Sequence, residues 1–224
     1  MLVTLVLFGA ALLGAGWMLT PSVDDAATRV AAQLAAHSAP PLRGAVPARM
    51  AEALVATENS RFYSTPGLDP ISVLRAPIAL VSGRDQGGAT LEQQLAKNLY
   101  EQGSMSLPAR AAEAVLALKL DRMWNKPQIL RMYLDDGYYG HGFYGLTAAS
   151  EGYFGVEPAA LSWAQASLLA GLFQAPSAYD PLRHPHAARA RQAHVLDRLV
   201  AVGTLTRARA DAIGRQSWEL RQAA

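Results

Sequence analysis

The chain of 224 residues contains no cysteine. This absence excludes disulfide bonds and thiol chemistry, although it does not place the protein in a particular compartment. Long stretches with alternating polar and apolar residues are scarce as well, so little of the chain is expected to form β-strands. The remaining pattern consists of apolar residues at helical spacing, and we therefore predict an all-α fold.

Charged side chains are missing from the first 19 residues, which are apolar or glycine apart from Thr4. As a helix this run would measure about 28 Å, close to the thickness of a bilayer core. We predict a transmembrane anchor over residues 1–20. A cleaved signal peptide is the main alternative, but its basic start and a clear cleavage site are missing, and a buried helix is a third. Without lysine or arginine the positive-inside rule assigns no topology.

Several chemical classes lack their signatures. None of the five histidines forms a pair at metal-ligand spacing, which argues against a zinc site. The serines do not lie in a nucleophile elbow, and the phosphate loop of nucleotide-binding enzymes is missing.

The rest of the chain divides at a proline-rich joint. We predict a juxtamembrane helix and linker over 21–45, ending near Ser38 to Pro41, and one domain over 46–224. A glycine- and tyrosine-rich loop is expected over 137–145, with aromatic rings that either stack on a sugar or fill the core. Expected helices in the domain cover 47–62, 70–80, 108–124, 126–134, 146–153, 158–173, 186–202 and 206–221.

The segment from Gly87 to Leu99 concentrates unusual features. Thr90 is a predicted N-cap, and Gln93 three residues later completes a capping-box pattern. Gln93, Gln94, Lys97 and Asn98 then fall on neighbouring faces of one short helix. A helix start beside a lysine suits an anion such as a phosphate. A capped surface helix without a ligand is the alternative.

Two glutamates stand out as candidate acid or base groups. Glu58 lies on an otherwise apolar helix just before Phe62 and Tyr63, and Glu113 lies in an alanine-rich turn. Apolar neighbours disfavour the charged form of a carboxyl and raise its pKa toward the range useful in catalysis. Paired carboxylates serve glycosyl chemistry. Two ordinary helix-surface glutamates are the alternative.

The C-terminal part is rich in arginine. From Pro181 onward eight arginines face three acidic residues, although the whole chain carries a formal charge of only +2. Such a segment favours a polyanionic partner such as anionic lipid headgroups, or else forms the solvated faces of helices.

Taken in order, these motifs resemble the peptidoglycan glycosyltransferases of family 51, over about Val46 to Pro181. The family's second motif, G-G-S-T-x-x-Q-Q-x-x-K-N, is the most specific match. It is matched by Gly87, Gly88, Thr90, Gln93, Gln94, Lys97 and Asn98. The first motif, E-D-x-x-F-x-x-H-x-G-x-D, is matched by Glu58, Phe62, Gly67 and Asp69. In the third, R-K-x-x-E, Arg110 stands in the place of the lysine and Glu113 in that of the acid.

The chain departs from the family pattern at six positions. Asn59, Thr65, Ala89 and Asp135 replace its Asp, His, Ser and Asn, and Met105 and Ala109 stand where arginines near the lipid diphosphate are usual. Fewer cations should weaken the binding of a diphosphate leaving group.

The resemblance implies a lysozyme-like helical domain that polymerises lipid II and releases undecaprenyl diphosphate. Glu58 would be the general base, and Glu113 would help place a divalent cation such as Mg²⁺. Gly88, Thr90, Gln93, Gln94, Lys97, Asn98 and Arg110 would bind the substrate and its diphosphate. The implied location is the bacterial inner membrane, in a single pass, with the catalytic domain on the periplasmic side. Lipid II, lipid-linked glycan and cell-wall synthesis proteins are the implied partners, with no nucleic acid. A non-catalytic lipid II-binding relative and a lytic, glycan-cleaving enzyme remain open.

Overall fold

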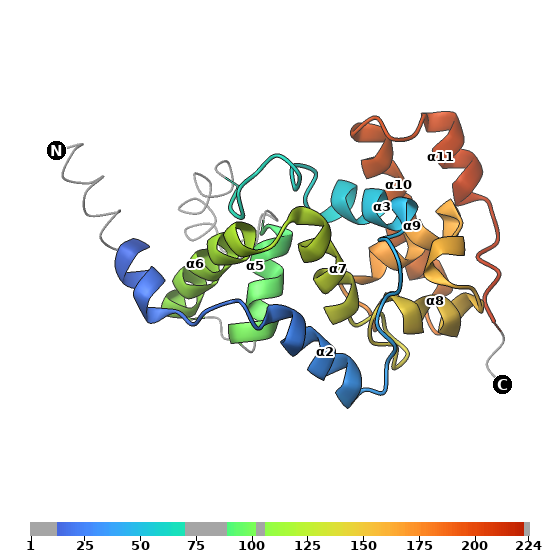
Figure 1. Cartoon of the computed structure of the whole chain (residues 1–224). Helices are drawn as coiled ribbons and strands as arrows, with labels where there is room; N and C mark the ends of the chain where they lie inside the picture. The colour runs from blue at the N-terminus through green and yellow to red at the C-terminus, as the bar shows by residue number, and fades with distance from the viewer. Residues whose placement is uncertain (1–12, 70–88, 102–105, 222–224) are drawn as a thin grey trace. The chain divides into compact units, whose positions relative to one another are not determined.

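The computed structural model describes residues 13–69, 89–101 and 106–221 (Figure 1). Within these ranges the regular structure is helical, and the β-type pairing is confined to an isolated bridge between Tyr138 and Tyr144. The prediction of an all-α fold is confirmed, and the architecture is consistent with a lysozyme-like helical domain.

The described helices follow one another in short steps. They are α2 (Ala26–Ala36), α3 (Ala48–Glu58), α5 (Leu91–Ala96), the π-helix η1 (Lys97–Glu101), α6 (Leu107–Met123), α7 (Lys126–Asp136), α8 (Leu146–Phe154), the 3₁₀-helix η2 (Pro158–Ala160), α9 (Trp163–Leu172), α10 (Pro185–Ala201) and α11 (Arg207–Gly214).

The chain forms two compact units. The first contains residues 1–29 and 61–129, and the second contains 30–60 and 130–224. Each is described separately below. The predicted boundaries of anchor, linker and domain stay predictions.

The first unit is built on the packing of α5 against α6 (Figure 1). Leu91 and Leu95 of α5 and Leu116 and Leu120 of α6 are fully buried. Ser106 caps α6 by accepting a hydrogen bond from the backbone N–H of Ala109, and Pro108 stands in the first turn. Because proline has no N–H to lose and a fixed φ, it suits this position.

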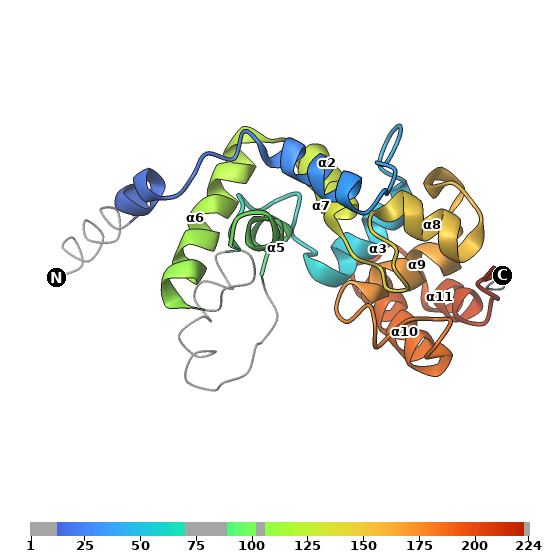
Figure 2. The same ribbon diagram turned by 90° about the horizontal axis from the view of Figure 1, so that it is seen from below.

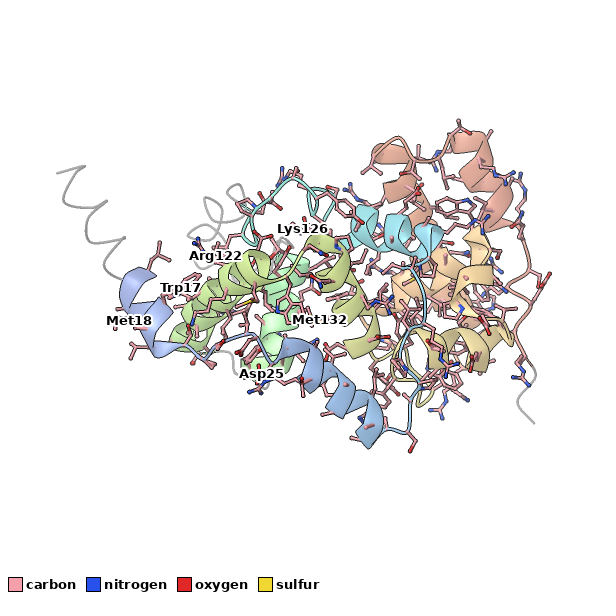
Figure 3. The ribbon with its side chains drawn as sticks, in the orientation of Figure 1. Trp17, Met18, Asp25, Arg122, Lys126 and Met132 are labelled. Atoms are coloured by element: carbon pink, nitrogen blue, oxygen red, sulfur yellow. The ribbon has the colours of Figure 1, made fainter. Side chains whose placement is uncertain are left out.

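An N-terminal segment is tied to α6. The Lys119 ammonium donates to the carbonyl oxygens of Thr20 and Pro21, at 2.8 and 2.9 Å, and lies 5.3 Å from the ring centre of Trp17. The indole N–H of Trp124 donates to the carbonyl of Val23 at 2.9 Å. Trp17, whose position is labelled in Figure 3, is therefore held beside α6 by a cation and a carbonyl anchor.

Across the described ranges, no helix combines the length and the apolar character needed to cross a membrane. Residues 1–12 of the expected anchor lie outside the described residues.

The second unit is organised around α9, in which nine consecutive residues, Ala164 to Leu172, are buried. Helices α3 and α10 both pack on it (Figure 2). Ser162 and Gln165 form a capping box at its start. A helix that is apolar on every side must be covered on every side, which places α9 in the core.

Three predicted helix boundaries were wrong. The helix expected over 47–62 ends at Glu58, because Asn59 takes an extended conformation with φ of −154°. The one expected over 158–173 is a 3₁₀ turn followed by a new helix that Ser162 caps. The last one ends at Gly214, since Trp218 leaves the helix to donate its indole N–H to Gln192. The helix expected over 70–80 lies outside the described residues.

Candidate active site

The predicted capping box at the start of α5 is confirmed. The Thr90 hydroxyl accepts the backbone N–H of Gln93 at 3.2 Å, and the Gln93 side-chain oxygen accepts the backbone N–H of Thr90 at 3.0 Å. Thr90 is buried, so the cap is shielded from water. The Gln93 side chain is thus engaged in holding the helix start as well as lying in the predicted binding motif.

The same threonine joins two of the sequence motifs. Its hydroxyl donates to the carbonyl oxygen of Gly67 at 2.6 Å. Gly67 has a φ of +65°, and a Cβ there would meet the backbone oxygen of Ala117 at 2.7 Å, so only glycine fits without a shift. An ion pair between Arg61 and Asp69 spans the same turn. The glycine and the acid of the first motif therefore shape the turn on which the second motif rests.

The candidate cationic side chains of the first unit are accessible. Lys97 and Asn98 are exposed at the start of the π-helix, and Arg110 is exposed on α6. Gln94 and Glu113 are half-buried. Gly88 and Met105 lie outside the described residues. The first unit thus carries the predicted diphosphate-binding residues and Glu113 on two helices that pack together.

The π-helix that carries Lys97 is secured from the N-terminal segment. The Arg29 guanidinium donates to the carbonyl of Leu99 at 3.2 Å and lies 4.5 Å from the ring centre of Tyr100. The Tyr100 hydroxyl donates to Asp25 at 2.7 Å. π-helical turns are uncommon and occur often at functional sites, so their stabilisation here is consistent with the predicted role of Lys97.

Glu58 lies at the last position of α3, in the second unit, with 17% of its side chain exposed. Its Oε1 is 3.5 Å from Nη2 of Arg191 on α10. The Nε of Arg191 donates to the carbonyl of Gly171 at 3.1 Å, which fixes the guanidinium. A neighbouring cation favours the ionised carboxylate, the form that a general base requires.

Tyr133 of α7 is a further neighbour of Glu58. Burial raises the pKa of its hydroxyl well above the ordinary value, and the negative charges of Glu58 and Asp136 raise it further. Its ring stacks on Phe173 with 4.9 Å between ring centres. The surroundings of Glu58 therefore combine a cation with an aromatic wall.

Sequence reasoning did not identify Arg191 and Tyr133. Arg191 was counted within the arginine-rich segment, yet three arginines of that segment serve the protein interior. Besides Arg191, Arg198 donates to the carbonyl of Ala56, and Arg189 lies 3.7 Å over the ring of Trp218. The available signal was position, because Arg191 precedes the buried Gln192 on a helix with a clear apolar face.

Three departures from the family pattern have structural settings. The Asp135 carboxylate accepts the backbone N–H of Leu42 at 3.0 Å, and burial raises its pKa. The Thr65 hydroxyl donates to the carbonyl of Arg61 at 3.0 Å. Asn59 is buried, and its side-chain nitrogen finds no hydrogen-bond partner within the described part of the chain.

No group of three histidine, aspartate or glutamate side chains able to hold a metal occurs among the described residues. The predicted metal ligand Glu113 would therefore supply one carboxylate. Mg²⁺ is commonly bound by one or two carboxylates together with substrate phosphates, so the residues fit this ion only when a diphosphate shares it.

An all-helical chain with a capped Gln-Gln-x-x-Lys-Asn helix locked to a glycine turn, and with a separate glutamate at a helix end, defines a transglycosylase-type domain. The family model described as "Transgly: Transglycosylase" matches residues 28–200. The chain belongs to this family, which confirms the resemblance to the peptidoglycan glycosyltransferases.

Individual relatives agree. The chain is 41% identical over 163 residues to penicillin-binding protein 1A of Aquifex aeolicus, covering 72% of this chain and 22% of that protein. It is 36% identical to a putative transglycosylase of Cupriavidus necator, covering 75% of this chain and 73% of that protein. The crystal structure of penicillin-binding protein 1A from Haemophilus influenzae aligns with a TM-score of 0.42 at 24% identity, over 59% of this chain and 16% of that one. The chain thus spans about a quarter of the length of the penicillin-binding proteins it matches.

Proposed function

We propose that this chain is a peptidoglycan glycosyltransferase that polymerises lipid II into glycan strands and releases undecaprenyl diphosphate. The observation that carries the proposal is the 2.6 Å hydrogen bond from Thr90 to Gly67, which joins the first two family motifs into one folded unit. A hydrolytic or lytic enzyme needs no site for a lipid diphosphate, so this preserved unit favours the polymerase.

Glu58 acts as the general base. Its carboxylate takes the proton from the 4-hydroxyl of the acceptor GlcNAc while that oxygen attacks C1 of the donor MurNAc. The bond from C1 to the diphosphate oxygen breaks, and the diphosphate departs with the electron pair. A single displacement inverts C1. Arg191, 3.5 Å away, keeps the carboxylate ionised before the step.

Cations and donors of the first unit stabilise the departing diphosphate. Lys97 and Arg110 are exposed and available to an anion. Fixed positive groups aimed at developing negative charge lower the barrier because they need no reorganisation during the step. Thr90, Gln93, Gln94 and Asn98 complete the site, together with Gly88.

Mg²⁺ is the divalent cation that we expect, with Glu113 as its protein ligand. When bound, it would neutralise charge on the diphosphate. Lipid II and lipid-linked glycan are the substrates, and cell-wall synthesis proteins are possible partners. We further propose a single-pass anchor in the bacterial inner membrane, with the catalytic domain in the periplasm. The apolar N-terminal run and the attachment of Thr20 to Val23 along α6 support this arrangement.

A non-catalytic lipid II-binding relative is the second candidate. Its support is Ala109, a small and buried residue at a position where the family usually has an arginine. The test gives purified full-length protein lipid II and Mg²⁺ in detergent and separates the products by size. Glycan strands support the polymerase. Lipid II that is bound but never polymerised supports the binding relative, and shortening of added glycan supports the lytic enzyme.

A further inference from the structure

A buried charge cluster lies beneath the start of α5. The ammonium of Lys126, at the first position of α7, is 2.6 Å from Oε1 of Glu92 and 2.6 Å from Oδ1 of Asp121. It also donates to the carbonyl of Thr65 at 2.7 Å and lies 4.8 Å from the ring centre of Phe62. Lys126 therefore connects α5, the end of α6 and the turn after Phe62, all within the first unit (Figure 3).

The cluster is an unusual way to stabilise a core. Glu92 is fully buried, and its Oε2 finds no hydrogen-bond partner within the described part of the chain. Buried ion pairs often contribute no more stability than apolar residues of similar volume, and an orphaned buried oxygen adds a cost. Stability alone does not account for this cluster.

Its location suggests a reason. Glu92 stands between the N-cap Thr90 and the two glutamines of the predicted diphosphate motif. From the buried side it fixes the first turn of α5, while Gln94 and Lys97 on the same segment reach the surface. Lys126 reaches that turn a second way, because it holds Thr65 while Gly67, two residues on, accepts the Thr90 hydroxyl.

We propose that Lys126 and Glu92 are positioning residues that set the first turn of α5 for binding of the donor diphosphate. The proposal rests on the function proposed above for its ligand. The positioning itself depends only on the contacts within the first unit. Neither side chain touches the substrate; both act through the backbone and side chains that follow Glu92.

Replacing Lys126 alone would leave Glu92 and Asp121 without their cation, and the protein could fail to fold. The informative variant is the double substitution Glu92→Leu with Lys126→Met, which exchanges the buried pair for apolar side chains. We expect its melting temperature to stay at or above that of the wild type. Arg122→Met is the matched control, because Arg122 is an exposed cation on α6 outside the cluster.

Two measurements on full-length protein test the proposal. The first is amide hydrogen exchange at Gln93 and Gln94, whose N–H groups donate to the side chain and the carbonyl of Thr90. In the double variant we expect exchange at these amides to be about tenfold faster or more, without loss of overall stability. The second is the dissociation constant for lipid II in detergent, which we expect to rise about tenfold or more, since small misplacements of a binding group are costly.

The outcomes separate the two proposals. Unchanged protection at Gln93 and Gln94 in a stable double variant overturns the positioning role, whatever the activity. Faster exchange with unchanged affinity for lipid II overturns its link to the donor site. Wild-type protein that does not bind lipid II contradicts the proposed function, while the exchange data still decide whether the cluster positions α5.

Discussion

The guanidinium of Arg191 on α10 lies 3.5 Å from the carboxylate of Glu58 at the end of α3, and both side chains are largely buried. Arg191 is itself held by the carbonyl of Gly171. Residues 133 positions apart in the chain thus form one charged pair next to the aromatic wall of Tyr133. This pair defines the electrostatic setting of the proposed base.

Replacing Arg191 by methionine should lower the rate of lipid II polymerisation by about tenfold or more, because a charge-assisted contact of this kind contributes about 1.5–3 kcal/mol. Arg191→Lys should recover part of the rate, since it keeps the charge but loses the planar fork that reaches Gly171. Arg209→Met, at an exposed position on α11, is the control. Initial rates at saturating lipid II decide the matter, and equal rates for Arg191→Met and the control would refute this role.

Replacing Thr90 by valine should destabilise the protein by about 2 kcal/mol, because it removes both a helix cap and a buried hydrogen bond to Gly67. Urea unfolding gives the free energy. Thr57→Val serves as the comparison, since the Thr57 hydroxyl only donates to a carbonyl of its own helix. A Thr90 variant no less stable than the Thr57 variant would show that the junction of the two motifs is energetically unimportant.

Replacing Gly67 by alanine should cost more stability than replacing Gly44. Both glycines have a positive φ, +65° and +69°, so both substitutions carry the backbone penalty of about 1–2 kcal/mol. Only at Gly67 would the new Cβ meet a backbone oxygen at 2.7 Å, whereas Gly44 faces open space. The difference in unfolding free energy between Gly67→Ala and Gly44→Ala isolates this clash. Equal losses would mean that α6 yields readily.

Sequence alone predicted the local features well. The helix periodicity, the Thr90 capping box and the loop over 137–145 depend on residues within a few positions of each other, and the structure confirms all three. Helix ends were less predictable where distant residues decide them. Trp218 leaves its helix because Gln192 offers a buried partner, and no local pattern carries that information.

The site shows the same division. Motif spacing identified Thr90, Lys97 and Glu58, but it did not identify the partner of Glu58, because the pair depends on how α3 and α10 both pack on α9. The proposed pairing of Glu58 with Glu113 across a groove stays a prediction.

Asp135 should make stability depend on pH. Burial raises its pKa above the unfolded value, so the folded state binds this proton more tightly. Its contribution to stability is therefore greatest in acid and is lost as the pH rises through the folded pKa. Asp135→Asn keeps an oxygen for the Leu42 N–H and removes the ionisation. We expect the variant to gain stability relative to wild type between pH 4 and pH 7 in urea unfolding; a constant or shrinking difference would contradict this assignment.

The most direct test of the proposed mechanism compares two glutamine substitutions on α3. Glu58→Gln should reduce the initial rate of lipid II polymerisation by about 10²-fold or more, the usual contribution of a general base. Glu52→Gln, at an exposed position of the same helix, should leave the rate unchanged, and both variants should show the wild-type far-ultraviolet circular dichroism. A Glu58→Gln variant that polymerises lipid II as fast as the Glu52→Gln variant would contradict the account.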